Sequence, residues 1–138
     1  MNGAHPLRLA VLGLSVAGVA VSGYLVSVHY ERVPLTCSTT GVVDCRAVLH
    51  SRYASVAGVP VALLGVIWFA VAGAAALRPV SRLTLAWAAL GVLAVLWLLV
   101  VELFLVDRIC LWCTAAHVLA LATSGLFLLQ ATRPARAA

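Results

Sequence analysis

The sequence predicts an all-α membrane protein, a four-transmembrane-helix bundle with a cysteine-bearing extracytoplasmic loop between its first and second helices. Hydrophobic residues make up 64% of the 138-residue chain and charged residues 9%, whereas about a quarter of the residues in a soluble domain are charged. The apolar residues gather in four blocks of about 20 residues, each long enough to cross a ~30 Å hydrocarbon core as a helix. We therefore expect a single four-helix membrane domain over residues 1–138, with spans at 9–28, 56–77, 83–101 and 109–129.

The connections between these blocks differ in length. The first block is longer than the roughly 7–15 apolar residues of a signal peptide, so we expect it to remain in the protein as a span. A long loop, 29–55, leads to the second block, and the turn Arg78–Arg82 leads to the third. The short link Glu102–Arg108 leads to the fourth block, after which Pro134 is expected to end the helix because Pro cannot continue it.

The distribution of arginines predicts the orientation. With four spans, both termini and the turn between the second and third spans lie on one side, and the two other connections lie on the opposite side. The terminal side carries five arginines and no acid, in short segments: Arg8, Arg78, Arg82, Arg133 and Arg136. The opposite side carries four arginines and all four acids. Because basic residues near span ends favour the cytoplasm, we expect cytoplasmic termini and a multi-pass protein of the bacterial plasma (inner) membrane. The absence of Lys from the C-terminal tail, which leaves no ER-retrieval signal, favours that membrane.

The four cysteines carry the chemical signal. Cys37 and Cys45 lie in the long loop, and Cys110 and Cys113 form a CxxC motif at the start of the last span. By parity all four lie on one face, the extracytoplasmic one. A helix start stabilises the thiolate, which is the nucleophile of disulfide exchange, so the motif favours redox chemistry. Structural disulfides and a Cys₄ zinc site remain alternatives, and four cysteines allow three pairings.

The combination of these motifs resembles the vitamin K epoxide reductase family, particularly its bacterial members. The loop has two cysteines, then Ser51 six residues after Cys45, then an aromatic residue, Tyr53. Gly58, Pro60 and Gly65 resemble the family's entry into the second helix, and the segment that begins Cys110-Leu-Trp-Cys113-Thr resembles its active site. The resemblance covers nearly the whole chain. A second quinone-linked family, the DsbB-like oxidases, has these two cysteine pairs in the reverse order.

The resemblance implies an electron relay. Cys37 would exchange with a thioredoxin-like dithiol partner acting in trans, and Cys45 would then exchange with Cys110. Cys113 would face a quinone of the menaquinone, ubiquinone or vitamin K type, held among the helices. The deeper position of Cys113 in the helix agrees with that role. No metal is expected at the site.

Two departures from the family pattern concern the quinone contacts. Many members carry an Asn near the start of the second helix, where this chain has Val61, which cannot form a hydrogen bond. Animal members carry a Tyr four residues after the motif, where this chain has His117. His117 lies one turn below Cys113 on the same helical face. An ionisable residue within a span is a functional candidate, so we expect His117 to contact the quinone, with packing against a neighbouring helix as the alternative.

Several residues near the motifs have two interpretations. Ser51 could contact the quinone or cap a helix end, and Tyr53 and Trp112 could cover the quinone or anchor the chain at the membrane interface. Residues 43–52 read as a short amphipathic segment over the bundle. Glu102 is expected to pair with Arg108 near the outer end of the third span.

These observations favour a membrane thiol–disulfide oxidoreductase, a quinone-dependent enzyme that supports disulfide formation outside the cytoplasm. Its expected partners are a thioredoxin-like protein, membrane lipid and a quinone. Nucleic acid is not expected, because the arginines form no basic run. Two alternatives remain: a vitamin K quinone or epoxide reductase driven by a dithiol reductant, and a non-enzymatic four-span protein with structural disulfides. The sequence leaves open which quinone, which partner, which direction and which oligomeric state apply.

Overall fold

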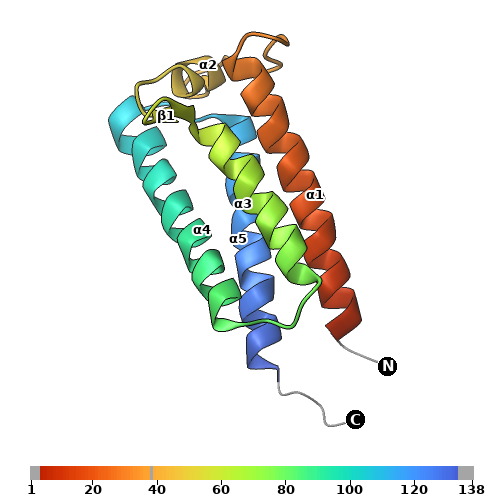
Figure 1. Ribbon diagram of the computed structural model, residues 1–138. Coiled ribbons are helices and arrows are strands. Elements are labelled where there is room, and N and C mark those ends of the chain that lie inside the picture. Colours follow the sequence, from red (N-terminus) through yellow and green to blue (C-terminus); the bar gives the residue numbers. More distant parts are fainter. Residues whose placement is uncertain (1–3, 38, 134–138) are drawn as a thin grey trace.

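The computed structural model describes residues 4–37 and 39–133, and most of them are helical (Figure 1). Pro134 and Arg136, used above for the helix end and the charge distribution, lie outside the described residues. The elements in chain order are helix α1 (Ala4–His29), helix α2 (Cys45–Leu49), strands β1 (Ser55–Val56) and β2 (Val59–Pro60), helix α3 (Val61–Ala76), helix α4 (Arg82–Val100), the π-helical segment η1 (Val101–Val106) and helix α5 (Leu111–Thr132).

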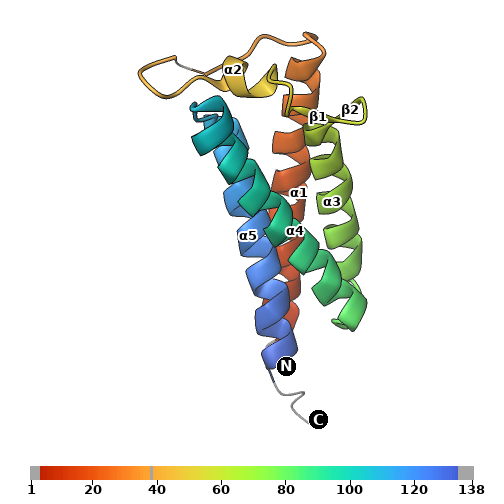
Figure 2. The ribbon, with the colours of Figure 1, turned by 90° about the vertical axis from the view of Figure 1, so that its left-hand side faces the viewer.

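The four long elements run alternately up and down (Figures 1 and 2). The start of α1, the α3–α4 turn and the end of α5 lie at one end of the bundle. The loop with α2, the β1–β2 hairpin and the start of α5 lie at the other, which we call the cysteine end. Three helices are long and apolar enough to cross a membrane: α1, α4 continued by η1, and α5. Helix α3 is a shorter apolar helix. The predicted all-helical membrane architecture is confirmed at this level.

The second predicted span is shorter than expected. Residues 55–60 form the hairpin instead of the first turns of a helix. Its two turn residues, Ala57 and Gly58, have φ values of 51° and 82°, the left-handed conformations that a two-residue hairpin turn requires. Pro60 then takes the N-cap position of α3, which covers 16 residues. Hydropathy alone, which suggested residues 56–77, cannot distinguish such an apolar hairpin from a helix.

The third predicted span, by contrast, is longer than expected. Helix α4 begins with a capping box, in which Ser81 and Thr84 satisfy each other's backbone N–H groups. The helix does not end near Val101 but continues through η1 to Val106, and Asp107 ends it in a left-handed conformation. Most of the expected link 102–108 is therefore helical, and Glu102 lies within the helix.

Close helix packing holds α3 against its neighbours. A Cβ at Gly18 of α1 would overlap the Phe69 ring of α3, so these two helices approach through a missing side chain. On its other side, α3 is joined to α4 by two reciprocal bonds. The Trp68 indole N–H donates to the Trp87 carbonyl oxygen at 3.0 Å, and the Trp87 indole N–H donates to that of Trp68 at 3.2 Å. Both indoles therefore have the partner that an apolar surrounding demands.

Candidate active site

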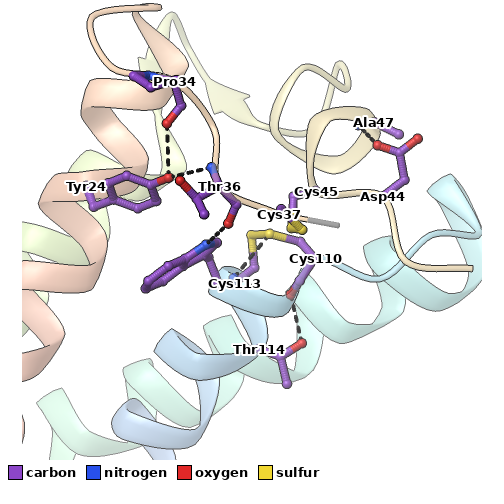
Figure 3. Close-up of a disulfide and its surroundings, with 11 residues drawn as sticks. Tyr24, Pro34, Thr36, Cys37, Asp44, Cys45, Ala47, Cys110, Cys113 and Thr114 are labelled. Atoms are coloured by element: carbon purple, nitrogen blue, oxygen red, sulfur yellow. Dashed lines mark hydrogen bonds between the residues drawn. A yellow bond between two sulfur atoms is a disulfide. The ribbon is translucent and has the colours of Figure 1, made fainter. Parts of the chain in front are cut away.

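Aromatic residues at the cysteine end fix the first half of the long loop. The Tyr24 hydroxyl of α1 donates to the Pro34 carbonyl oxygen at 3.2 Å and accepts from the Thr36 N–H at 2.9 Å. The Trp112 indole N–H of α5 donates to the Thr36 carbonyl oxygen at 2.8 Å, and its ring packs on that of Tyr24 with 4.8 Å between centroids. These contacts hold the residue immediately before Cys37 over the start of α5 (Figure 3).

A short parallel backbone pairing fixes the second half. The Ile109 N–H donates to the Val42 carbonyl oxygen at 2.8 Å, and the Asp44 N–H donates to the Ile109 carbonyl oxygen at 3.0 Å. Asp44 is also the N-cap of α2, since its carboxylate accepts from the Ala47 N–H at 3.0 Å. Asp44 and Ile109 each directly precede a cysteine, so this pairing brings Cys45 and Cys110 to the same place from residues far apart in the sequence.

The four cysteines form two disulfides in one cluster. Cys37 bonds to Cys45, with their Cα atoms 6.3 Å apart, and Cys110 bonds to Cys113, with Cα atoms 5.1 Å apart. Cys45 and Cys110 are 1% and 0% exposed and share one buried apolar cluster, against which the two other cysteines pack. Figure 3 shows the two sulfur pairs together above α5. Among the residues that the structure describes, no group of three or more His, Cys, Asp or Glu is arranged to hold a metal ion.

The CxxC motif forms the cap of α5. Cys110 is the N-cap, with an extended backbone, and its sulfur accepts from the Cys113 N–H at 3.2 Å. The Thr114 hydroxyl donates to the Cys110 carbonyl oxygen at 2.9 Å. The motif therefore lies at the helix start, as the sequence predicts. Because the free N–H groups there favour negative charge, the position stabilises a sulfur that leaves or attacks as a thiolate.

A cavity of about 430 Å³ lies below the CxxC motif, between α1, α3, α4 and α5 and under α2. Nearly all of its lining is apolar, and it includes Trp68, Trp87 and side chains of α4 such as Leu98. Cys113 lines the cavity whereas Cys110 does not. The deeper cysteine of the motif thus faces the cavity, and the shallower one packs against the loop.

The predicted contact residues divide into two groups. Ser51, Tyr53, Val61 and His117 line the cavity, and Trp112 does not. The Trp112 indole is instead bonded to the Thr36 carbonyl oxygen of the loop, and its predicted contact with a quinone stays a prediction. The Ser51 hydroxyl also donates to the Val48 carbonyl oxygen at the end of α2, at 2.9 Å. Its helix-end role is therefore observed, and its contact with a quinone stays a prediction.

Glu102 lines the same cavity and is the site residue that sequence reasoning missed. The expected Glu102–Arg108 ion pair does not form, because Arg108 contacts the carboxylate of Asp107 at 3.9 Å instead. Glu102 is 3% exposed, and one of its carboxylate oxygens lies 4.0 Å from Nδ1 of His117. The signal in the sequence is an acid inside an apolar run that continues to Val106, but the predicted span ends at Val101, before the acid.

The comparison with known families agrees with this geometry. Residues 9–128 match the profile of the vitamin K epoxide reductase family. The chain belongs to this family. A search of curated proteins found no match. This vitamin K epoxide reductase family member is therefore a membrane-integral oxidoreductase with two cysteine pairs, and the resemblance seen in its motifs is confirmed.

Members of the vitamin K epoxide reductase family generally use quinones, and the cavity fits such a group. Small-molecule sites are mostly apolar spaces of roughly 300–1,000 Å³ with a few polar groups. Here the polar groups include the Cys113 sulfur, the Ser51 hydroxyl and the His117 imidazole. Nδ1 of His117 is buried and has no hydrogen-bond partner among the described residues, so a polar donor or acceptor remains available within the cavity.

Replacing Cys113 by Ala should trap a Cys45–Cys110 disulfide. In this variant the Cys110 thiolate has lost its own partner, and the loop disulfide is the nearest bond that it can attack, releasing the Cys37 thiol. Mass mapping of alkylated, non-reduced protein would identify the new bond. The control is Cys110→Ala, in which the loop disulfide should remain. Recovery of the Cys37–Cys45 disulfide alone from both variants would contradict an exchange between Cys45 and Cys110 and would favour structural disulfides.

Proposed function

We propose that this protein is a quinone-dependent thiol–disulfide oxidoreductase that accepts electrons from a thioredoxin-like dithiol protein. The electrons pass through the loop pair Cys37–Cys45, then through Cys110–Cys113, to a quinone in the cavity. The observation that carries the proposal is the continuous arrangement of the two disulfides and the cavity, in which Cys45 packs beside Cys110 and Cys113 faces the space below. Disulfides with a purely structural role would not require one sulfur of the second pair, Cys113, to line an apolar cavity.

The first step takes place at Cys37. This cysteine is partly exposed, whereas Cys45 is 1% exposed. A thiolate of the partner attacks the Cys37 sulfur and releases the Cys45 thiol, and the partner's second thiol then completes the exchange. The loop pair is reduced by two electrons, and the partner is oxidised to a disulfide.

The second step moves the electrons inward. The Cys45 thiolate attacks the Cys110 sulfur, which releases the Cys113 thiolate toward the cavity, and the Cys37 thiol then attacks Cys45 to restore the loop disulfide. The pairing of Asp44 with Ile109 supports this step because it holds Cys45, which attacks, next to Cys110, which is attacked. The reduced CxxC motif holds two electrons and two protons, which is what a quinone takes up when it becomes a hydroquinone.

The cavity residues provide binding and polarity. Val61, Trp68 and Trp87 give an apolar wall that excludes water from the reacting centre. His117 lies one turn below Cys113, where its imidazole can donate a hydrogen bond to a quinone oxygen as negative charge develops there. Ser51 and Tyr53, which come from the loop, close the cavity from the cysteine end.

We also propose that α3 is the fourth span and that the cysteine end faces outward. Helices α1 and α4 both run from the terminal end toward the cysteine end, so the chain must return between them, and α3 is the element that does so (Figure 1). The greater density of arginine at the terminal end favours the cytoplasm on that side. The extracytoplasmic side of a bacterial plasma membrane is oxidising, where such disulfides persist.

The orientation predicts that Cys37 can be labelled from outside the cell. In a variant that retains only Cys37, a membrane-impermeant maleimide should react in intact cells, because the loop faces the medium or periplasm. A single cysteine placed at Pro79, in the exposed turn between α3 and α4 at the opposite end of the bundle, is the matched control and should react only after the inner face is opened. The reverse pattern would overturn the orientation.

Replacing Cys45 by Ala should allow a mixed disulfide to accumulate between Cys37 and an added thioredoxin-like protein that keeps only the attacking cysteine of its CxxC pair, activated as a mixed disulfide with thionitrobenzoate. The Cys37 thiolate attacks the sulfur of the added protein and releases thionitrobenzoate, and neither protein then has a neighbouring thiol that can break the adduct. Non-reducing electrophoresis would show the adduct. The Cys37→Ala variant is the control, and an adduct that forms only in that variant would reverse the roles of the two cysteines.

Replacing His117 by Ala should slow quinone reduction by about 10²-fold, the lower end of the effect of losing a general acid. Exchange at Cys37 should be unchanged, because that step takes place outside the cavity. His117→Tyr, which introduces the residue of animal members, should recover part of the loss. Steady-state kinetics with a soluble quinone would measure this, with the exposed His50→Ala as the control. An unchanged rate and affinity in His117→Ala would reduce His117 to a packing residue.

A further inference from the structure

We propose that Glu102 and His117 form one proton-holding pair in the cavity, in which Glu102 positions the imidazole and supplies the charge that makes it a proton donor. This inference rests on the proposed function for its substrate, because the acceptor of the proton is the quinone. Glu102 acts through His117 and is therefore a positioning residue. The pair joins two helical elements, since Glu102 belongs to η1 and His117 to α5.

The geometry of the two side chains supports the pair. The Glu102 carboxylate oxygen and Nδ1 of His117 are 4.0 Å apart, and the side chains are 4% and 8% exposed. Nδ1 has no hydrogen-bond partner among the described residues. The separation is within ion-pair range and longer than a hydrogen bond, and catalytic hydrogen bonds often shorten only when the substrate is bound. Both residues line the cavity together with Cys113.

The surroundings leave Glu102 no other ionic partner among the described residues. Arg108 is turned toward Asp107, and these two side chains are 43% and 86% exposed. The other titratable groups that line the cavity are His29, Tyr53 and the Cys113 thiol. A buried carboxyl without a cation costs several kcal/mol unless it is protonated or paired. The backbone N–H of Cys110 offsets part of this cost, and a proton shared with the buried imidazole beside it offsets more.

Glu102 lies on the face of η1 that points into the bundle. Val101 and Glu102 are both 3% exposed, whereas Leu103, Phe104 and Leu105 are 48%, 77% and 46% exposed. A shift of one residue toward the C-terminus would place the acid among the side chains that face lipid, where its charge has no partner. The π-helical turn therefore presents Glu102 to the cavity and the next three residues to the membrane.

The proposed pair can deliver protons to the quinone when the CxxC motif reduces it. When Cys110 and Cys113 form their disulfide they lose two electrons and two protons, and a quinone that becomes a hydroquinone gains the same numbers. In the charged pair His117 is an imidazolium, with its Nδ1–H donating to the Glu102 carboxylate and the transferable proton on Nε2. That proton moves to one quinone oxygen, which leaves a neutral imidazole with its proton on Nδ1. One of the two protons released from the CxxC thiols, one turn above, then returns to Nε2, and the other goes to the second quinone oxygen. Glu102 stabilises the imidazolium each time it forms.

The pair can be tested without any quinone by nitrogen NMR of ¹⁵N-histidine-labelled protein, with the His117 signals assigned by His117→Ala. In the wild-type protein we expect Nδ1 of His117 to carry a proton, because Glu102 accepts from it. In Glu102→Leu, which has no acceptor, we expect this signal to shift to that of an unprotonated Nδ1. Asp107→Asn is the matched control, since it removes a nearby acid that is 86% exposed and does not line the cavity. Identical His117 signals in wild type and Glu102→Leu would overturn the pair.

The functional role is tested by a double-mutant cycle with a soluble quinone. We expect Glu102→Gln to lower kcat for quinone reduction about 10-fold with little change in KM, and Asp107→Asn to leave it unchanged. In the His117→Ala background, Glu102→Gln should have no further effect, because it acts through the imidazole. Multiplicative losses would show that Glu102 acts independently and would overturn the proposal. An equal thermal midpoint and an equal rate of exchange at Cys37 show that each variant is folded.

The outcomes separate this inference from the proposed function. If the wild-type protein does not reduce a quinone, the proposed function fails, while the NMR result still decides whether the pair exists. If the wild-type protein reduces quinone and Glu102→Gln matches it, the proposed function stands and the pairing role is wrong.

Discussion

The arrangement of this molecule depends on the two backbone hydrogen bonds that join the end of the long loop to the residue before the CxxC motif. Val42 and Asp44 are bonded to Ile109 at 2.8 and 3.0 Å. This pairing is only one bridge long, so it cannot be stable alone. It is held because Asp44 caps α2 on one side, and Ile109 precedes the capping residue of α5 on the other. Without it, only the contacts of Thr36 would hold the loop disulfide near the helix disulfide, and Cys45 would no longer be positioned beside Cys110.

Polar side chains within the bundle are few, and those that donate hydrogen bonds mostly do so to backbone carbonyl oxygens. The Ser124 hydroxyl donates to the Ala88 carbonyl oxygen of α4 at 3.1 Å, and the Thr123 hydroxyl donates within its own helix at 2.8 Å. These bonds, like the reciprocal tryptophan pair, satisfy donors that lipid cannot. Glu102 and His117 depart from that pattern, because both are buried and ionisable, and both lie in the half of the bundle near the cysteine end. The buried ionisable side chains Glu102 and His117 thus lie together around one cavity.

Much of the fold followed from the sequence because the bilayer sets the length and hydropathy of its helices. The starts of α1, α4 and α5 fall within a few residues of the predicted blocks, and the CxxC motif caps α5 as expected. The errors arose where a short-range conformation overrides composition. The turn at Ala57 and Gly58 shortens α3, and the left-handed residue Asp107 lies six residues beyond the predicted end of the third span. Backbone conformation of this kind leaves little trace in hydropathy.

The same distinction applies to the site. Spacing alone placed Cys113 and His117 on one helical face, because a CxxC motif and its i+4 neighbour share one helix. The cavity partner of His117 could not be identified in that way. Glu102 lies on another helix, and its contact depends on where the π-helical turn faces relative to α5. A one-residue register difference between two helices decides whether the acid faces the lipid or the imidazole, and only the packing of the two helices fixes that register. The CxxC motif can thus be recognised from a few neighbouring residues of the sequence. The proposed proton-holding pair depends instead on contact between two helices that the sequence presents as separate spans.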